Sequence, residues 1–313
     1  KCIYSVLDDM PMLLPQQLKL WQWMADYYMC TLGDIYKAAL PAGLKAEDGY
    51  RPKTETYVGL TEKFHDEMAL NIALDMVSRY EKQQKALAGY LELSHWAEMS
   101  GTAIPDDIKE ITQTELCNVT HCTTPTVKSL VKRGILEIYQ KEVGRLNTDG
   151  EFTPQNAKLL NEAQQEAYNQ VLMQFMKKNV VLLHGVTSSG KTEIYIHLIL
   201  KALQDHKQVL FLLPEIALTV QIMERLQRVF GSRLGIYHSK YSDAERVEIW
   251  KKQVSACPYD IIIGARSAAL LPFKNLGLVI IDEEHETSYK QQDPAPRYHA
   301  RSAAIMLASM YGA

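Results

Sequence analysis

Residues 179–192 read NVVLLHGVTSSGKT, and this stretch decides the fold class. An apolar run leads into the pattern GxxxxGK[ST], and the amphipathic run TEIYIHLI follows directly. This order predicts a strand, a phosphate-binding loop and a helix. Gly185 and Gly190 let successive N–H groups face phosphate oxygens. Lys191 can then reach the β- and γ-phosphates, and the Thr192 hydroxyl can ligate Mg²⁺.

Four more apolar runs follow the phosphate-binding loop: QVLFLLP, RLGIYH, YDIIIGA and LGLVIID. Runs without polar alternation are typical of strands buried on both faces of a parallel sheet, and amphipathic stretches separate them. We therefore expect residues 151–313 to form a RecA-like, doubly wound, mainly parallel α/β domain. Ligands of such domains bind at the carboxyl ends of the strands.

Acidic residues follow the last of these runs. Asp282 ends LGLVIID, where it can hold Mg²⁺, and Glu283 beside it can orient or deprotonate the attacking water. A dedicated metal cluster within residues 283–286 is the competing interpretation. Helical metal sites place their ligands at i and i+4, and the sequence has no HExxH pattern, so we interpret His285 as a residue that couples nucleotide to the rest of the protein.

Two other strand ends carry small or charged residues. PEIALT follows VLFLL, and ARSAA follows DIIIG. Small hydroxyl residues, an arginine and backbone amides at strand ends suit contacts with phosphodiesters. Alternatively, Arg266 caps a helix or pairs with an acid.

The chain before residue 150 has a different pattern of apolar and polar residues. Residues 1–52 carry the helical pattern LPQQLKLWQWMADYYM, with Leu18, Trp21, Met24 and Tyr28 on one stripe, and then LGDIYKAAL and a polar linker. Residues 53–150 contain TQTELCNVT, TTPTVKSLVKRGI and ILEIYQKEV, in the order helix, turn, helix, strand. That order predicts a winged-helix (α+β) domain.

The second helix of this domain exposes Lys128, Lys132 and Arg133 in the prediction, and these cations could meet DNA phosphates. A protein-binding winged helix, or a small helical packing module with ordinary surface lysines, explains the same pattern.

The net charge of −3 argues against a generally basic coat for nucleic acid but allows a local basic groove. No apolar run reaches the roughly 18 residues of a spanning helix, and the first residues show no signal-peptide pattern. The five cysteines lack CxxC spacing, which favours reduced thiols in the cytosol over a zinc site.

Several segments together resemble the family of bacterial primosomal replication-restart helicases in superfamily 2. They are GVTSSGKTEIY, LLPEIALTVQ, YHSKYSDAERVEIW, IIIGARSAALLPFKNLGLVIIDEEHETSYKQQ and PRYHAR, with WMADYYMCTLGDIYKAALPAGL and LVKRGILEIYQKEVGR upstream. The resemblance implies ATP-dependent 3′-to-5′ DNA unwinding with ATP and Mg²⁺, and recognition of stalled or branched forks. It also implies loading of the replicative helicase with primosome proteins and single-stranded DNA-binding protein, by a monomer in the bacterial cytoplasm near the nucleoid.

The resemblance also assigns roles to residues. Gln164 would recognise adenine, and Asp282 and Glu283, with Lys191, would drive hydrolysis. Residues around the phosphates would be Gly185, Ser188, Ser189, Gly190, Lys191, Thr192 and Glu193. Residues that contact DNA or couple it to ATP would be Pro214, Glu215, Thr219, Gly264, Arg266, Ser267, His285, Tyr289, Lys290, Arg297, Tyr298, His299 and Arg301.

Three positions depart from that family. Ser188 stands where many relatives have glycine, and Ser302 follows Arg301 where aspartate is common. Some relatives place a tryptophan in the loop after DEEH, whereas this chain has proline and alanine at 294–296. Stacking on DNA bases is therefore expected from Tyr289 or Tyr298.

Nothing in the sequence resembles the second motor lobe with its zinc-binding cysteines, or most of an N-terminal DNA-binding domain. We expect this chain alone to bind nucleotide weakly and not to unwind DNA, because a translocating motor closes ATP between two lobes. A winged-helix regulator with an ATP-sensing domain, or another superfamily 2 DNA-dependent ATPase, is the alternative.

Overall fold

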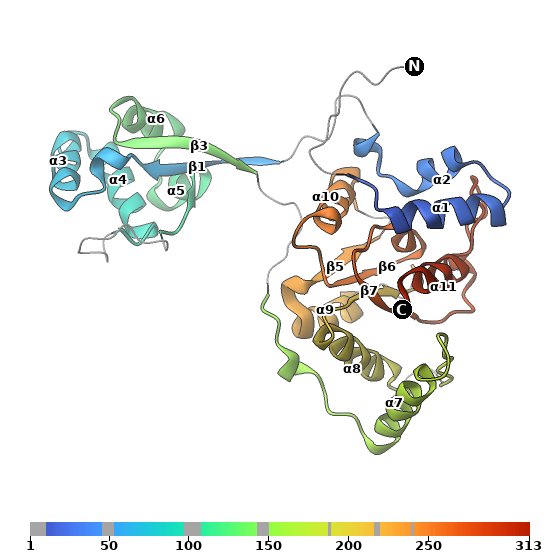
Figure 1. Cartoon of the computed structure of the whole chain (residues 1–313). Coiled ribbons are helices and arrows are strands. Elements are labelled where there is room, and N and C mark those ends of the chain that lie inside the picture. Colours follow the sequence, from blue (N-terminus) through green and yellow to red (C-terminus); the bar gives the residue numbers. More distant parts are fainter. Residues whose placement is uncertain are drawn as a thin grey trace. The chain divides into compact units, whose positions relative to one another are not determined.

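A computed structural model describes residues 11–45, 53–96, 108–142, 150–186, 189–215, 220–238 and 241–313. The chain forms two compact units (Figure 1): residues 52–144, and residues 1–51 together with 145–313. The three-part division expected from the sequence therefore differs from the spatial one. In the part that the structure describes, no helix has the length and apolar character needed to cross a bilayer.

The smaller unit has the predicted winged-helix fold. Its antiparallel sheet has the order β2-β1-β3, with β1 from Thr54–Leu60 and β3, the wing strand, from Leu136–Glu142. The remaining elements are α3 (Glu67–Val77), α4 (Glu81–Leu93), β2 (Ile111–Thr112), α5 (Gln113–Thr120) and α6 (Thr124–Lys132). Gly134 follows α6 with a φ of +70°, which glycine adopts without steric penalty.

Of the three cations predicted to face DNA, Arg133 makes contacts within its own unit instead. Lys128 and Lys132 on α6 are exposed, as expected. Arg133 is half-buried, because its guanidinium lies 4.4 Å from the ring centroid of Tyr80 and donates a hydrogen bond to the carbonyl of Met76. Its side chain therefore braces this unit internally.

The larger unit has the predicted α/β fold. Its four described strands are all parallel and lie in the order β5-β6-β4-β7. They are β4 (Gln208–Leu212), β5 (Leu234–Tyr237), β6 (Ile261–Gly264) and β7 (Leu276–Ile281). The helices are α1 (Pro15–Tyr27), α2 (Leu32–Ala39), α7 (Glu162–Phe175), α8 (Lys191–Gln204), α9 (Val220–Phe230), α10 (Asp243–Val254) and α11 (Ala300–Tyr311).

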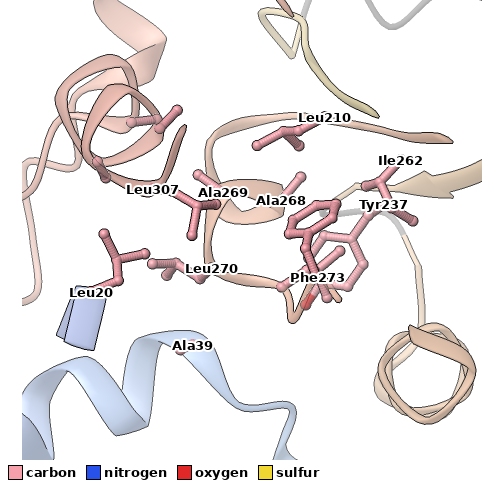
Figure 2. Packing of buried hydrophobic residues seen from close by; sticks show 14 of the residues in the cluster. Leu20, Ala39, Leu210, Tyr237, Ile262, Ala268, Ala269, Leu270, Phe273 and Leu307 are labelled. Atoms are coloured by element: carbon pink, nitrogen blue, oxygen red, sulfur yellow. The ribbon is translucent and has the colours of Figure 1, made fainter. Parts of the chain in front are cut away.

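Side chains alternate between the two faces of this sheet, and both faces are buried. Leu210 and Ile262 pack with α1, α10 and α11, whereas Val209 and Ile261 pack with α8 and α9. Figure 2 shows the first of these layers, where Leu20 of α1 meets the same cluster. Full burial of one such aliphatic side chain contributes about 1.5–3 kcal/mol. The doubly wound arrangement therefore has a core on each side.

The α1 helix belongs to this core, although about 100 residues separate it from the rest of the unit. Its buried stripe is Gln17, Leu20, Trp21, Met24 and Ala25. The predicted stripe was partly wrong, because Leu18 is 49% exposed and Leu20 takes its place against the sheet. The side-chain amide of Gln17 donates to the carbonyl of Leu270 at 2.8 Å, which fixes α1 on the sheet.

The strand predicted before the phosphate-binding loop is absent from the described structure. Residues 180–186 form no strand, and Val180 and Leu182 are exposed. Residues 178–186 and 277–285 both line a cavity of about 1260 Å³. The segment before the loop is thus unpaired in the described structure, and β7 is the last strand of the described sheet.

Candidate nucleotide-binding site

The phosphate-binding loop is braced by Gln164. Gly190 has a φ of +84°, and a Cβ built there would lie 2.2 Å from Nε2 of Gln164. That Nε2 donates to the carbonyl of Gly190 at 3.4 Å, while Oε1 of Gln164 accepts from the N–H of Asn161 at 3.0 Å. Glycine is therefore favoured at residue 190 because it adopts this left-handed backbone conformation without steric penalty.

Lys191 joins the loop to the acidic end of β7. Its Nζ donates to the carbonyl of Gly185 at 3.0 Å and lies 3.4 Å from Oε1 of Glu283. Only 18% of the lysine side chain is exposed. Thr192 lies in the first turn of α8, where the first N–H groups of a helix have no intrahelical partner and attract anions. Ser189 is exposed beside the loop, and Ser188 lies outside the described residues.

Asp282 is held from three directions at the end of β7. Its N–H donates to the carbonyl of Leu212 on β4 at 3.0 Å. The Tyr195 hydroxyl donates to Oδ1 of Asp282 at 3.1 Å, and the Tyr289 hydroxyl donates to its carbonyl at 2.7 Å. Burial, reinforced by the Asp282 charge, raises the pKa of both tyrosines. Both phenols therefore remain donors and orient the aspartate.

The next two acids also have cationic partners. Glu283 has a φ of +47°, a left-handed conformation that non-glycine residues seldom adopt outside functional sites. One of its carboxylate oxygens faces Lys191, and the other lies 3.8 Å from Nε2 of the exposed His285. Glu284 forms an ion pair with Arg301 of α11. No group of three His, Cys, Asp or Glu side chains could hold a metal among the described residues.

The side chain of Glu193, which was predicted to lie near the phosphates, is engaged elsewhere in this structure. The carboxylate is buried and pairs with Arg225 of α9, so it stabilises the contact between α8 and α9. At the end of β4, Pro214 is buried and Glu215 is exposed, whereas Thr219 lies outside the described residues.

Arg266 pairs with no acid among the described residues and donates to backbone carbonyls instead. Its Nη1 donates to the carbonyl of Lys290 at 3.1 Å and lies 3.4 Å from that of Ser288, which ties the 3₁₀ turn Arg266–Leu270 to the loop after β7. Ser267 is partly buried in the same turn. Gly264 precedes it, and a Cβ there would lie 2.4 Å from the carbonyl oxygen of Tyr237, so the strands approach too closely for a side chain.

Tyr289 and Tyr298, which were predicted to stack on DNA bases, are buried in this structure. Their side chains are 0% and 1% exposed, and they lie in the core with Tyr237 and Ala268. The Tyr298 hydroxyl donates to the carbonyl of Arg266 at 3.3 Å. Neither ring offers a face to a base, because both are covered by the sheet and α1.

The cations of this loop sit at its surface. Nζ of Lys290 lies 5.6 Å from the ring centroid of Tyr28 and donates to the carbonyl of Arg297. Arg297 is exposed and pairs with Asp293 at 2.7 Å. His299 precedes α11, and its Nδ1 accepts from the N–H of Arg301. The loop therefore presents charge to solvent and keeps its rings inside.

Exposed aromatic residues of α1 were missed in the sequence as binding candidates. Trp23 and Tyr27 stack with ring centroids 4.8 Å apart, and Tyr28 meets both edge-on. The Tyr28 hydroxyl accepts from the N–H of His299 at 3.1 Å, which brings α1 to the loop after β7. The signal in the sequence was the spacing of Lys19, Trp23 and Tyr27, four residues apart on the face opposite the buried stripe.

Three family models match successive parts of the chain. Residues 1–41 match a 3′ DNA-binding domain, residues 55–143 match a winged-helix domain of PriA helicases of Bacteroidota, and residues 161–309 match a DEAD/DEAH box helicase domain.

Curated relatives are similar over most of the chain. Replication restart protein PriA of Bacillus subtilis is 33% identical across 97% of this chain and 43% of that protein. The protein of that name in Chlamydia trachomatis is 33% identical across 96% of this chain and 38% of its own length. The one from Helicobacter pylori is 43% identical over 49% of this chain and 24% of that protein. The chain thus spans about two fifths of the length of the first two relatives.

Proposed function

Since the chain belongs to the PriA family of replication restart proteins, we propose that it forms the ATP-binding lobe and winged helix of an ATP-dependent 3′-to-5′ DNA helicase. The enzyme would recognise stalled or branched forks and help to reload the replicative helicase. The direction of unwinding and the ATP hydrolysis are part of this proposal.

The contact between Lys191 and Glu283 carries the proposal. It brings the phosphate-binding loop within 3.4 Å of the acidic end of β7, although the two residues are 92 positions apart in sequence. A lysine that already touches a carboxylate and a loop carbonyl can exchange both for phosphate oxygens, which are also anionic acceptors. The adjacent start of α8 adds backbone N–H groups that favour the same anion.

The side chains around the phosphate-binding loop and after β7 have the chemistry to hold Mg²⁺ and ATP. The bound nucleotide would supply the phosphoanhydride bond that is cleaved, and the metal would neutralise charge on it. Thr192 and Asp282 would hold the metal, and the hydroxyl of Tyr195 keeps the Asp282 carboxylate in place. Glu283 would orient or accept a proton from the attacking water. Gln164 would contact adenine as well as bracing Gly190.

Single-stranded and forked DNA are the proposed nucleic-acid partners, with primosome proteins and single-stranded DNA-binding protein as protein partners. The 3′ DNA-binding model at residues 1–41 and the winged helix support a DNA role. We also propose that residues 53–150 form the winged-helix domain and that residues 151–313 form the first motor lobe. The protein would act as a monomer, and zinc would bind only in a second lobe.

Nucleotide binding is the direct test of the site. Titration of the 313-residue chain with a fluorescent ATP analogue and Mg²⁺ should give saturable binding. Lys191→Ala should weaken it about 10- to 150-fold, because hydrogen bonds to charged groups contribute about 1.5–3 kcal/mol. Lys201→Ala is the matched control, since it removes an exposed lysine from the same helix about 15 Å further along. Equal affinities of wild type and Lys191→Ala would overturn the site.

Unwinding is a separate matter. We expect the purified chain to leave a forked duplex intact, because one lobe supplies only half of a closed ATP site. Strand separation by this chain in the presence of Mg²⁺ and ATP would contradict that expectation.

A further inference from the structure

The exposed aromatic cluster on α1 has no role in the nucleotide site. We propose that Trp23, Tyr27 and Tyr28 form a platform on which bases of single-stranded DNA stack. This inference rests on the proposed DNA-dependent function and names the surface that meets the DNA strand.

The rings of the platform are held in place by one another, and Tyr27 is open to solvent. The rings of Trp23 and Tyr27 are nearly parallel, with an interplanar angle of 19°, and Tyr28 buttresses both at 83°. Tyr27 is 60% exposed, whereas Trp23 and Tyr28 are partly buried against the core of the larger unit. A ring that is packed on one side and exposed on the other loses little conformational entropy when a base stacks on it. Base–aromatic stacking is also tolerant of sequence.

Charge around the platform is suited to a phosphate backbone. Lys19 is exposed one helical turn before Trp23, on the same side of α1. Lys290 lies over the ring of Tyr28 from the other side. Asp26 is the opposing charge beside Tyr27, and its carboxylate accepts a hydrogen bond from Gln22 at 3.1 Å. Two lysines flanking stacked rings match a strand that alternates bases and phosphates.

The platform also contacts the machinery of the nucleotide site. The Tyr28 hydroxyl accepts from the N–H of His299 at 3.1 Å and lies 3.4 Å from its carbonyl. His299 is the N-cap of α11, and Arg301 of this helix pairs with Glu284, the neighbour of Glu283. A strand seated on α1 would thus touch a continuous series of contacts that ends at the acids of β7. Single-stranded DNA is favoured over a duplex because a duplex hides the faces of its bases.

The test measures fluorescence anisotropy of labelled oligo(dT) with the 313-residue chain and no nucleotide. Tyr27→Ala should weaken binding by roughly tenfold, which is within the range measured for loss of one stacked base. Tyr27→Trp should restore wild-type affinity, because it retains an aromatic face. Phe152→Ala is the matched control, since it removes another exposed ring, 4.5 Å from the guanidinium of Arg233 just before β5.

Two further arms separate stacking from charge. An abasic oligonucleotide has the same phosphates without bases, so wild type and Tyr27→Ala should bind it equally. Asp26→Asn should tighten oligo(dT) binding, because it removes the negative charge beside the platform.

Each outcome decides a separate question. If wild type binds oligo(dT) and Tyr27→Ala binds it as tightly, the platform is wrong and the proposed function stands. A loss in Tyr27→Ala that persists on the abasic strand also overturns stacking. If the wild-type chain binds no oligo(dT), both the platform and the proposed DNA contact of this chain fail, whereas ATP-analogue binding would remain to support the nucleotide site.

Discussion

Two groups of aromatic residues meet at the loop after β7, and they differ in what covers them. Tyr289 and Tyr298 belong to the loop itself and are fully buried, with their hydroxyls bonded to backbone carbonyls. Trp23 and Tyr27 come from α1, more than 250 residues earlier, and Tyr27 stands open to solvent.

The difference shows that position in a motif and availability to a ligand are separate properties. The loop tyrosines hold Asp282 and Arg266 in place, so we assign them to positioning the nucleotide site. The α1 aromatics have the exposed face that stacking requires. We propose that the loop after β7 couples the two regions through its backbone and its charges, while its own rings form part of the core.

The largest expected effect is on folding. Tyr298→Ala should lower the free energy of unfolding by about 3–5 kcal/mol, the usual loss for a buried large aromatic, whereas Tyr27→Ala should change it by less than about 0.5 kcal/mol. Urea unfolding followed by circular dichroism measures both. Similar losses for the two variants would remove the distinction between a buried and an exposed group. Because Tyr298→Ala is expected to disturb the fold, it is a poor probe of DNA coupling.

A smaller effect isolates one hydroxyl. Tyr289→Phe keeps the buried ring but removes the donor to the carbonyl of Asp282, and should reduce stability by about 1 kcal/mol. Tyr27→Phe, at an exposed hydroxyl, should leave the unfolding midpoint unchanged. A Tyr289→Phe variant as stable as wild type would show that this hydrogen bond does not fix the end of β7.

The smallest effect concerns pH. Burial, with the charges of Arg301 and Lys290, lowers the pKa of His299, and Glu284 opposes this only in part. The unfolded chain therefore binds a proton at higher pH than the folded chain. The contribution of His299 to the free energy of unfolding is complete above the unfolded pKa of about 6.5. It is lost as pH falls through the lower pKa that His299 has in the folded chain.

His299→Asn tests this contribution. Asparagine keeps a side-chain acceptor for the N–H of Arg301 but does not titrate, so the fall in thermal midpoint between neutral and mildly acidic pH should be shallower than in wild type. The same slope in both proteins would assign the acid sensitivity to other groups.

Local patterns predicted much of this fold. The apolar runs at 208–212, 234–237, 261–264 and 276–281 are the four described strands, and the helix, turn, helix, strand order gave the winged helix. The phosphate-binding loop and the acids after β7 lie together as predicted, with Lys191 3.4 Å from Glu283, although no strand precedes the loop in the described structure.

Long-range contacts explain what the patterns did not predict. Burial of Tyr298 and pairing of Glu193 with Arg225 depend on which elements pack above them, and no local spacing encodes that. The membership of α1 in the larger unit rests on contacts such as Gln17 with Leu270, 253 residues apart. The run at 180–185 has strand composition, but a strand also needs a partner, and in the described structure this run forms no strand and lines a cavity together with residues of β7.

We propose that Lys191 and the acids after β7 form one ATP site that responds to DNA. Its most direct test is the rate of ATP hydrolysis by the full-length protein, with and without forked DNA, in wild type and Lys191→Ala. We expect DNA to stimulate the wild-type rate and Lys191→Ala to abolish hydrolysis in both conditions. Hydrolysis by Lys191→Ala at the wild-type rate would contradict it.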